Sequence, residues 1–318
     1  MSAASEQIRP IKQSKGFWGR LKANLVRDKV LLIMMVPVVA YFLVFAYTPM
    51  VGVVIAFQRF KPGGGFFSGE WVGFRYFTEF FESMYFTRLI RNTLLISLYS
   101  LIWGFPLPII FALMLNDIRQ AKFKRFVQTV SYLPHFISVV IVVGMMFNLF
   151  STQGGVINML LSRFGVSPIR FMTSSRYFRT MYIGSGIWQS FGWSSIIYLA
   201  ALSGIDMEQY EAARIDGANK FKQMIHVTLP GIRPTVILLL ILNLGSIMGV
   251  GYEKIILMYS PATYEVADVI STYVFRRGLQ DAQYSFGAAV GLFNSVINFM
   301  FLIIVNKISK KLSSISLW

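Results

Sequence analysis

A polar, helix-prone segment of the chain reads Glu211-Ala212-Ala213-Arg214-Ile215-Asp216-Gly217 and closes further on at Leu229-Pro230. It is the longest segment of this kind between two long apolar runs. Charged side chains are costly to bury in hydrocarbon, so this segment must lie in water. We interpret it as a loop that another protein contacts, and the flanking apolar runs as the part of the chain that this contact moves.

The bulk composition is that of an integral membrane protein. The chain of 318 residues is 55% hydrophobic and 14% charged, with a mean hydropathy of +0.58, whereas soluble domains carry about 25% charged residues. It contains no cysteine, which excludes disulfides and thiolate metal sites. Its two histidines, His135 and His226, are far apart in sequence and argue against a histidine metal centre. We therefore expect no metal site in this chain.

The net charge of +16 is explained by membrane topology rather than by nucleic-acid binding. Lysine and arginine accumulate beside the spans on the cytoplasmic side, and the basic residues of this chain lie next to its apolar runs. Residues 1–29 are basic and polar, without the short apolar core and small-residue cleavage site of a signal peptide. We predict a cytoplasmic tail there, followed by a retained first anchor.

Six apolar runs are long enough to cross a bilayer, which takes about 20 helical residues. They are residues 30–57, 94–115, 129–150, 181–202, 236–252 and 286–305. Six spans put both termini on one side, and the basic residues of the second loop and the C-terminal tail agree with that side being cytoplasmic. The predicted domains are a tail at 1–29, a six-helix transmembrane domain at 30–308 with its polar loop at 203–230, and a tail at 309–318.

The six runs contain no Asp, Glu, Lys or Arg. Carriers driven by an ion or proton gradient commonly place ionisable residues inside the bundle, so the energy must come from elsewhere or the protein is a passive pore. Polar and aromatic side chains that could line a polar path are Gln189, Trp193, Asn243, Tyr252 and Asn294. The alternative for the amides is that they join helices through interhelical hydrogen bonds.

The polar loop predicts two short helices separated by a glycine turn. Asp206 is a good N-cap for a helix from about 207 to 215, and Gln209 three residues later completes a capping-box pattern. Gly217 tolerates the left-handed conformation that ends a helix. A second helical stretch is expected from 218 to about 227, ending at the Leu-Pro pair before the fifth span.

The residues on the first of these helices suit a docking surface. Ala212 and Ala213 are small and would let a partner surface approach closely. The charges of Glu211 and Arg214 beside them can fix the register of that contact. The alternative is a well-capped surface loop without a partner.

The spacing in this loop resembles the EAA signature of importer-type ABC permeases. That signature reads Glu-Ala-Ala, three residues, Gly, nine residues, an aliphatic residue, one residue and Leu-Pro. The matching positions are Glu211, Ala212, Ala213, Gly217, Leu229 and Pro230, with Val227 where isoleucine is usual. Asp216 and Ala218 also fit the carbohydrate-importer version. Residues 268–278 and 284–287 are similar to the LplB-type branch, which is associated with oligosaccharides cut from complex, often uronate-containing, polysaccharides.

The resemblance implies an all-α integral membrane protein with the type I ABC importer permease fold, in which six transmembrane helices carry a cytoplasmic coupling helix. It assigns coupling to an ATPase to the loop residues Asp206, Glu211, Ala212, Ala213, Arg214, Asp216, Gly217, Leu229 and Pro230. The chain would be a transport subunit, not an enzyme, with no catalytic residues and no bound cofactor. It has no Gly-x-x-x-x-Gly-Lys-Ser/Thr run, so ATP and Mg would be used by the partner ATPase.

The resemblance also implies a set of partners. A sister permease would pair with this chain as a heterodimer, two cytoplasmic ABC ATPase subunits would each grip one coupling helix, and an extracellular solute-binding lipoprotein would deliver an oligosaccharide. The chain would lie in the bacterial cell membrane as a multi-pass protein, surrounded by membrane lipid, with both termini cytoplasmic and no contact with nucleic acid.

Two other classes of protein are weighed against this one. A stand-alone secondary carrier or channel for a polar solute would not need the EAA pattern, and the missing intramembrane carboxylates argue against a carrier. An intramembrane enzyme would need a paired nucleophile and base at membrane depth. His135, near the start of the third run, is the only histidine in a span, and packing of a helix-end side chain explains it better.

Overall fold

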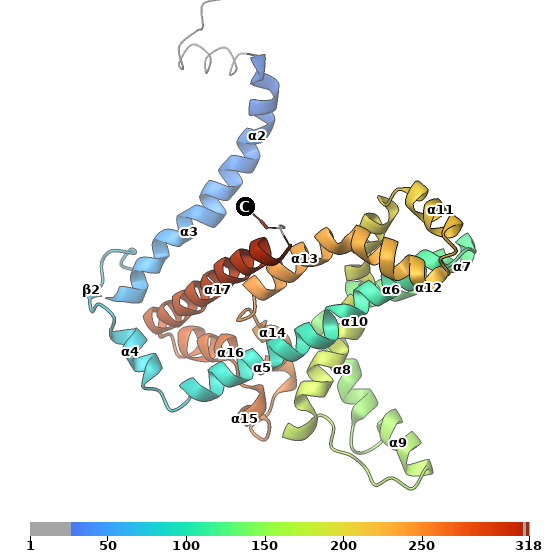
Figure 1. Ribbon diagram of the computed structural model, residues 1–318. Coiled ribbons are helices and arrows are strands. Elements are labelled where there is room, and N and C mark those ends of the chain that lie inside the picture. The colour runs from blue at the N-terminus through green and yellow to red at the C-terminus, as the bar shows by residue number, and fades with distance from the viewer. Residues whose placement is uncertain (1–26, 314–315, 318) are drawn as a thin grey trace, which may run out of the picture. The chain divides into compact units, whose positions relative to one another are not determined.

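The computed structural model describes residues 27–313 and 316–317 and divides the chain into two compact units (Figure 1). The first unit ends at Val54 and the second begins at Ile55. Most of the predicted basic tail lies outside the described residues, which begin at Arg27. The described chain is helical apart from one short pair of strands and the connecting loops.

The first unit is an apolar helix that changes its pitch before Pro49 and continues past it. Its elements are α2 (Lys29–Phe42), the π-helical turn η1 (Leu43–Tyr47) and α3 (Thr48–Val51). The Thr48 hydroxyl donates to the Leu43 carbonyl oxygen at 2.8 Å. Pro49 lies in the first turn of α3, where its missing N–H costs little. The wider π turn therefore carries the helix past the proline.

The second unit consists of short helices around a few long ones, with one β-hairpin. The boundary between the units falls inside the 3₁₀ helix η2 (Gly52–Phe57). The elements that follow it are β1 (Gln58–Arg59), β2 (Glu70–Trp71), α4 (Arg75–Phe81), α5 (Phe86–Gly104), α6 (Pro106–Asp117), α7 (Ala121–Tyr132), η3 (Leu133–Phe136), α8 (Val139–Phe150), α9 (Val156–Arg163), α10 (Ser175–Ser203), α11 (Met207–Ile215), α12 (Lys220–Gln223), η4 (Met224–Thr228), α13 (Leu229–Gly245), α14 (Tyr252–Met258), α15 (Tyr264–Ala267), α16 (Ile270–Val274), η5 (Phe275–Gln280) and α17 (Tyr284–Ser313). The strands pair antiparallel, with Gln58 opposite Trp71 and Arg59 opposite Glu70.

In the described chain, four helical segments are long and apolar enough to cross a membrane. They are Lys29–Phe57, Phe86–Asp117, Lys220–Gly245 and Tyr284–Lys311, with a bent pair, Ala121–Phe136 and Val139–Phe150, as a fifth if it counts as one span. The helix α10 is 29 residues long but is not among these apolar segments. The number six stays a prediction.

Two predicted spans differ from the structure. The run 129–150 was expected as one helix, but the chain bends by 99° between Phe136 and Val139. Pro134 lies in the 3₁₀ turn before this bend, and the Ser138 side chain caps the next helix by accepting from the Ile141 amide. The fifth span was expected at 236–252. The helix instead ends at Gly245, because the glycine-rich segment that follows favours a loop before α14.

Long helices of the second unit pack at close range where small residues allow it. Figure 1 shows α13 and α17 side by side. A side chain at Gly287 of α17 would meet the Gly278 backbone of η5, with its Cβ 2.8 Å from the Gly278 Cα. Apolar packing joins α6, α10 and α13 through Ala112, Tyr198 and Ile232. The helix α10 is therefore held along its side by neighbours that come from both halves of the sequence.

Candidate functional site

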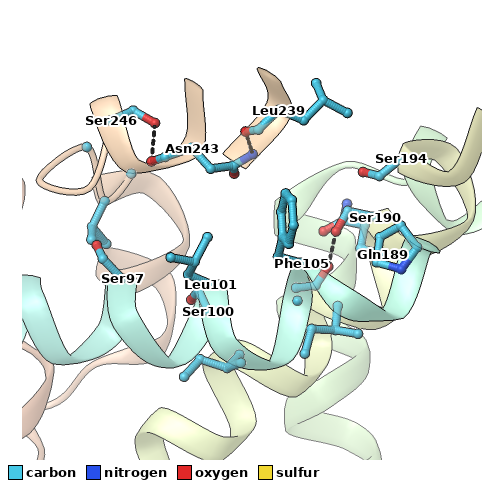
Figure 2. Close-up of a pocket in the computed structure, with 18 of the residues that line it drawn as sticks. Ser97, Ser100, Leu101, Phe105, Gln189, Ser190, Ser194, Leu239, Asn243 and Ser246 are labelled. Carbon is cyan, nitrogen blue, oxygen red and sulfur yellow. Dashed lines mark hydrogen bonds between the residues drawn. The ribbon is translucent and has the colours of Figure 1, made fainter. Parts of the chain in front are cut away.

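A cavity of about 750 Å³ lies between helices of the second unit (Figure 2). Its walls come from α5, α6, α10, α13 and the segment leading into α14. The volume is in the range of small-molecule sites, about 300–1,000 Å³. Helix α10 contributes the largest share of the lining, which explains its composition: its sequence alternates apolar residues with serines, glycines and Gln189. A helix that faces a polar path needs fewer apolar residues than one surrounded by lipid.

Neutral polar groups make up most of the polar lining. They are Ser97, Ser100, Gln189, Ser190, Ser194, Asn243 and Ser246. Gln189 donates from its amide nitrogen to the Ile137 carbonyl oxygen at 2.7 Å, which ties α10 to the bend before α8. Asn243 donates to the Leu239 carbonyl oxygen of its own helix at 2.8 Å. Each amide thus uses one of its two N–H donors in this bond.

Aromatic packing supports one wall of the cavity. The Trp193 indole stacks on the His135 imidazole, with ring centroids 4.7 Å apart and planes 2° apart. Phe136 meets the same indole edge to face at 5.4 Å. His135 therefore packs against a neighbouring helix, as expected for a helix-end histidine, and Trp193 remains 42% exposed on the cavity side.

Lys254 is the one charged residue among those that line the cavity in the described chain. Its Nζ donates to the Tyr182 carbonyl oxygen at 3.0 Å and lies 5.1 Å from the centre of the Tyr182 ring. Lys254 belongs to α14, outside the four apolar segments, and burial lowers the pKa of its ammonium group to about 8.

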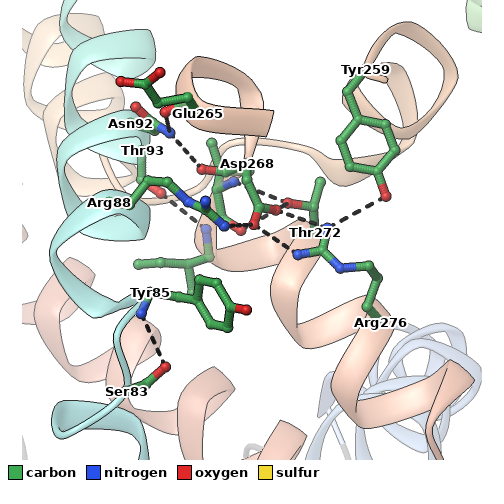
Figure 3. Close-up of polar contacts among 12 residues, drawn as sticks. Ser83, Tyr85, Arg88, Asn92, Thr93, Tyr259, Glu265, Asp268, Thr272 and Arg276 are labelled. Atoms are coloured by element: carbon green, nitrogen blue, oxygen red, sulfur yellow. Dashed lines mark hydrogen bonds and ion pairs between the residues drawn. The ribbon is translucent and has the colours of Figure 1, made fainter. Parts of the chain in front are cut away.

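A buried ionic network shares two helices, α5 and α10, with the cavity (Figure 3). Asp268 is fully buried and receives two hydrogen bonds from Arg276, at 2.9 and 2.7 Å, and one from Arg88 at 3.2 Å. Asn92 donates to the Asp268 backbone oxygen and accepts from Arg179 of α10. The network joins α5, α10, η5 and the loop between α15 and α16.

The loop at 203–230 begins with a short capped helix, α11. The Asp206 carboxylate accepts from the Glu208 amide at 3.0 Å, which confirms the predicted N-cap. Gly217 has φ +75° and its amide donates to the Arg214 carbonyl oxygen, while the Ala218 amide donates to the Ala213 carbonyl oxygen. These two bonds form the Schellman motif, which explains why a glycine stands at this position.

The second half of the loop runs without a break into the fifth helix. After the N-cap Asn219, α12 and the π turn η4 lead directly into α13. The predicted end at Leu229-Pro230 is therefore wrong: the π turn η4 comes directly before α13, and its wider turn lets the helix continue past Pro230. The Tyr210 hydroxyl lies 3.0 Å from the Thr228 hydroxyl and holds α11 against the π turn.

The outer face of α11 and α12 is accessible in this chain. Glu211, Ala212, Arg214, Asp216 and Gly217 are exposed, and Ala213 is half-buried. Three large apolar side chains accompany them: Met207 is 61%, Ile215 87% and Phe221 63% exposed. Small, charged and apolar side chains on one loop suit a protein partner.

Loop and cavity share two helices. The loop begins where α10 ends, at Ser203, and passes into α13, and both helices line the cavity. Ile205 packs with the α6–α10–α13 cluster at this end. The loop is therefore joined directly to two walls of the cavity, α10 and α13.

The structure brings the predicted residues together in two groups. The predicted coupling residues all lie in the loop or at its junction with α13, and Gln189, Trp193 and Asn243 line the cavity. Tyr252 instead stacks on Phe275, with ring centroids 5.0 Å apart, and Asn294 has a buried amide oxygen; neither lines this cavity. Their roles stay predictions.

Sequence reasoning assigned no role to Lys254 or to Asp268. The segment that begins at Asp268 was selected only for its family resemblance. Arg276, eight residues after Asp268, could have indicated an ion pair. Lys254 follows the fifth apolar run and carried no such signal.

Comparisons with known proteins agree over most of the chain. Residues 104–314 match the protein family described as "Binding-protein-dependent transport system inner membrane component". Two similar proteins are from Bacillus subtilis (strain 168). Protein LplB is 46% identical over 289 residues, 91% of each chain. The polygalacturonan/rhamnogalacturonan transport system permease protein YteP is 43% identical over 292 residues, 92% of this chain and 91% of YteP.

A solved structure is similar as well. It is a chain of the bacterial alginate ABC transporter in complex with an alginate pentasaccharide-bound periplasmic protein. That chain is 42% identical to this one, with a TM-score of 0.85, and the match covers 94% of this chain and 100% of that chain.

Removal of the Asp268 carboxylate should destabilise the protein. In Asp268→Ala, the guanidinium groups of Arg88 and Arg276 would share a site without a counter-charge. Breaking a buried pair from one side costs about 3–5 kcal/mol, and the partial exposure of both arginines favours the lower end. The solubilised variant should lose its monodisperse chromatographic peak at a lower heating temperature than the wild type.

The control for this variant is Asp281→Ala. Its carboxylate is 52% exposed and lies 3.7 Å from Arg277, so its loss should leave the transition temperature nearly unchanged. Equal behaviour of the two variants would contradict a stabilising role for the Asp268 network.

Cysteine accessibility tests the cavity directly, because the chain has no native cysteine. Ser100→Cys and Asn243→Cys should react with a small water-soluble thiol reagent, since both positions line the cavity. Asn294→Cys, at a position with a buried amide oxygen, should react far more slowly. Equal protection of all three thiols in the folded protein would mean that water does not reach the cavity.

Proposed function

Since the chain belongs to the family of binding-protein-dependent transport system inner membrane components, we propose that it forms one half of the path through which an ABC importer moves an oligosaccharide. Members of this family are transport subunits and not enzymes. The observation that carries the proposal is that the two helices flanking the EAA loop, α10 and α13, also line the polar cavity. The site where a partner would push and the site where a solute would pass are thus built on the same elements.

The proposed substrate is an oligosaccharide that contains uronate units. YteP is named for polygalacturonan and rhamnogalacturonan, and the similar solved transporter carries alginate as its stated substrate. The cavity supports a sugar ligand in two ways: it offers many hydroxyl and amide groups for hydrogen bonds, and an exposed indole face at Trp193. Its volume accommodates a part of such a chain.

The proposed assembly contains a sister permease, two cytoplasmic ABC ATPase subunits and an extracellular solute-binding lipoprotein. The similar solved transporter was captured with its substrate-bound periplasmic protein, which supports a binding-protein partner here. ATP and Mg would be used by the ATPase subunits.

We further propose that the chain lies in the bacterial cell membrane with both termini and the loop at 203–230 in the cytoplasm, with tails at 1–29 and 309–318 around the transmembrane domain.

The proposed mechanism is a rigid-body alternation. An ATPase would grip α11 through its small and apolar exposed residues, including Ala212 and Ile215. When the two ATPases close, α11 moves, and the Tyr210–Thr228 contact and the uninterrupted run into α13 carry that movement to the cavity walls. Packed helices shift between discrete arrangements, so the cavity would open to one side of the membrane at a time.

Gly217→Val should uncouple ATP hydrolysis from transport. At φ +75° a residue with a side chain is strained by about 1–2 kcal/mol. That energy lowers the population of the capped conformation by a factor of about 5–30. We expect the chain to insert and assemble, but oligosaccharide uptake into proteoliposomes by the complete complex should fall by about that factor. Glu211→Lys, which reverses an exposed charge on α11, should give the same result.

Two variants control for backbone strain. Gly165 ends α9 with φ +76° and the same pair of cap hydrogen bonds, so Gly165→Val carries equal strain away from the loop and should keep uptake. Gly217→Asn should also keep uptake, because asparagine tolerates this conformation. Normal uptake by both Gly217→Val and Glu211→Lys would overturn the coupling role of the loop.

A further inference from the structure

We propose that Lys254 is the residue by which this permease selects acidic sugar units, by pairing its ammonium group with a substrate carboxylate inside the cavity. The proposal rests on the oligosaccharide importer function above and names a specificity residue for that path. It is carried by the position of the lysine in the cavity wall, the absence of a counter-charge there in the described chain, and the polar side chains of α10 that line the same cavity.

Lys254 has no acidic partner within the described chain. Its only hydrogen bond there goes to the neutral Tyr182 carbonyl oxygen, at 3.0 Å. No aspartate or glutamate is among the described residues that line the cavity, and none of the described ion pairs includes Lys254. The neighbouring Glu253 is exposed and does not line the cavity. The cavity wall therefore carries a net positive charge.

A partly buried cation without a counter-charge costs free energy, because water solvates it better than the protein does. The same chain shows the opposite arrangement at Asp268, whose buried carboxylate is bound by Arg88 and Arg276. The cost at Lys254 is offset when a bound anion supplies the missing charge. A carboxylate-bearing sugar that passes through the cavity is an anion of that kind.

The backbone of α10 lies close to one side of the ammonium group. A Cβ added at Gly186 would be 3.5 Å from Nζ, an ordinary van der Waals distance, so a ligand would reach the group from the cavity. Gln189 and Ser190 follow three and four residues later, on the same face of α10, and both line the cavity. A carboxylate at Lys254 would thus have hydrogen-bonding groups for the adjacent sugar hydroxyls.

Lys254 also has a structural role that the test must separate from specificity. Its hydrogen bond to the Tyr182 carbonyl oxygen and its contact with the Tyr182 ring tie α14 to α10. Lys254→Gln removes the charge and keeps an N–H donor, on a side chain that is one atom shorter. Lys254→Arg keeps the charge. A purely structural tie would affect charged and neutral saccharides equally.

The test measures saccharide binding in the cavity of the complete complex, without the binding protein. Ser100→Cys serves as the reporter, and a water-soluble thiol reagent labels it in the presence of trigalacturonic acid or its neutral trimethyl ester. With Lys254 present, the acid should protect the thiol at a concentration about tenfold or more below that of the ester, as for a charge-assisted hydrogen bond. Lys254→Gln should abolish this difference, and Lys254→Arg should retain most of it.

The control variant Lys307→Gln removes an exposed cation of α17 that does not line the cavity, and should keep the preference. An unchanged preference in Lys254→Gln, or equal weakening of both saccharides, would overturn the proposal. ATP-driven uptake by the same complex with its binding protein distinguishes the importer function from the role of Lys254. Uptake whose preference for the acid does not depend on Lys254 overturns only this inference. Absence of any saccharide uptake overturns the importer function and the inference with it.

Discussion

The unbroken hydrogen-bond ladder of α10 is the constraint on which the rest of the structure depends. This helix has 29 residues and no proline, and at 1.5 Å per residue it is about 44 Å long. Arg179 near its start bonds to the buried network, Gln189 and Trp193 in its middle line the cavity, and the loop at 203–230 begins at its end. Two other long segments are interrupted: α5 and α6 meet at Pro106, and the α7–α8 pair bends by 99°. The helix α17 is continuous as well, but none of its described residues lines the cavity. Because α10 is continuous, one uninterrupted helix connects the buried network, the cavity and the loop.

The charges of Asp268 and Lys254 have different surroundings, and the difference follows from where each residue lies. Asp268 lies in a packed junction between helices, where two arginines satisfy it and the network fixes the junction. Lys254 lies in a cavity wall, where its protein partner is a neutral carbonyl group. A satisfied charge holds helices together, whereas an unsatisfied charge in an open cavity is available to a ligand.

Local signals in the sequence predicted the polar loop well. The N-cap at Asp206 and the glycine cap at Gly217 depend on a few neighbouring residues, so both could be derived before the structure was known. Hydropathy did not predict the bend before α8. Pro134 and Ser138, which lie at the bend, are part of an apolar run whose hydropathy is that of a single span.

The site required tertiary information. Gln189, Trp193 and Asn243 were selected from the sequence for their chemistry, but only the packing of α10 against α13 separates them from Tyr252 and Asn294. Lys254 lies beyond the fifth apolar run and resembles any basic residue next to a span. Its place in the cavity wall depends on the loop after Gly245, which turns α14 back towards α10.

The most direct test of this account is a pair of spin-label distances in the complete complex, with and without trapped ATP. The first pair joins Thr180 near the start of α10 to Gln209 on α11, both exposed. The second joins Gln209 to the matching loop of the sister permease. Transmission through a rigid α10 predicts that the first distance stays constant while the second changes. A first distance that changes while the second stays constant would contradict it, because the loop would then move without the helix that lines the cavity.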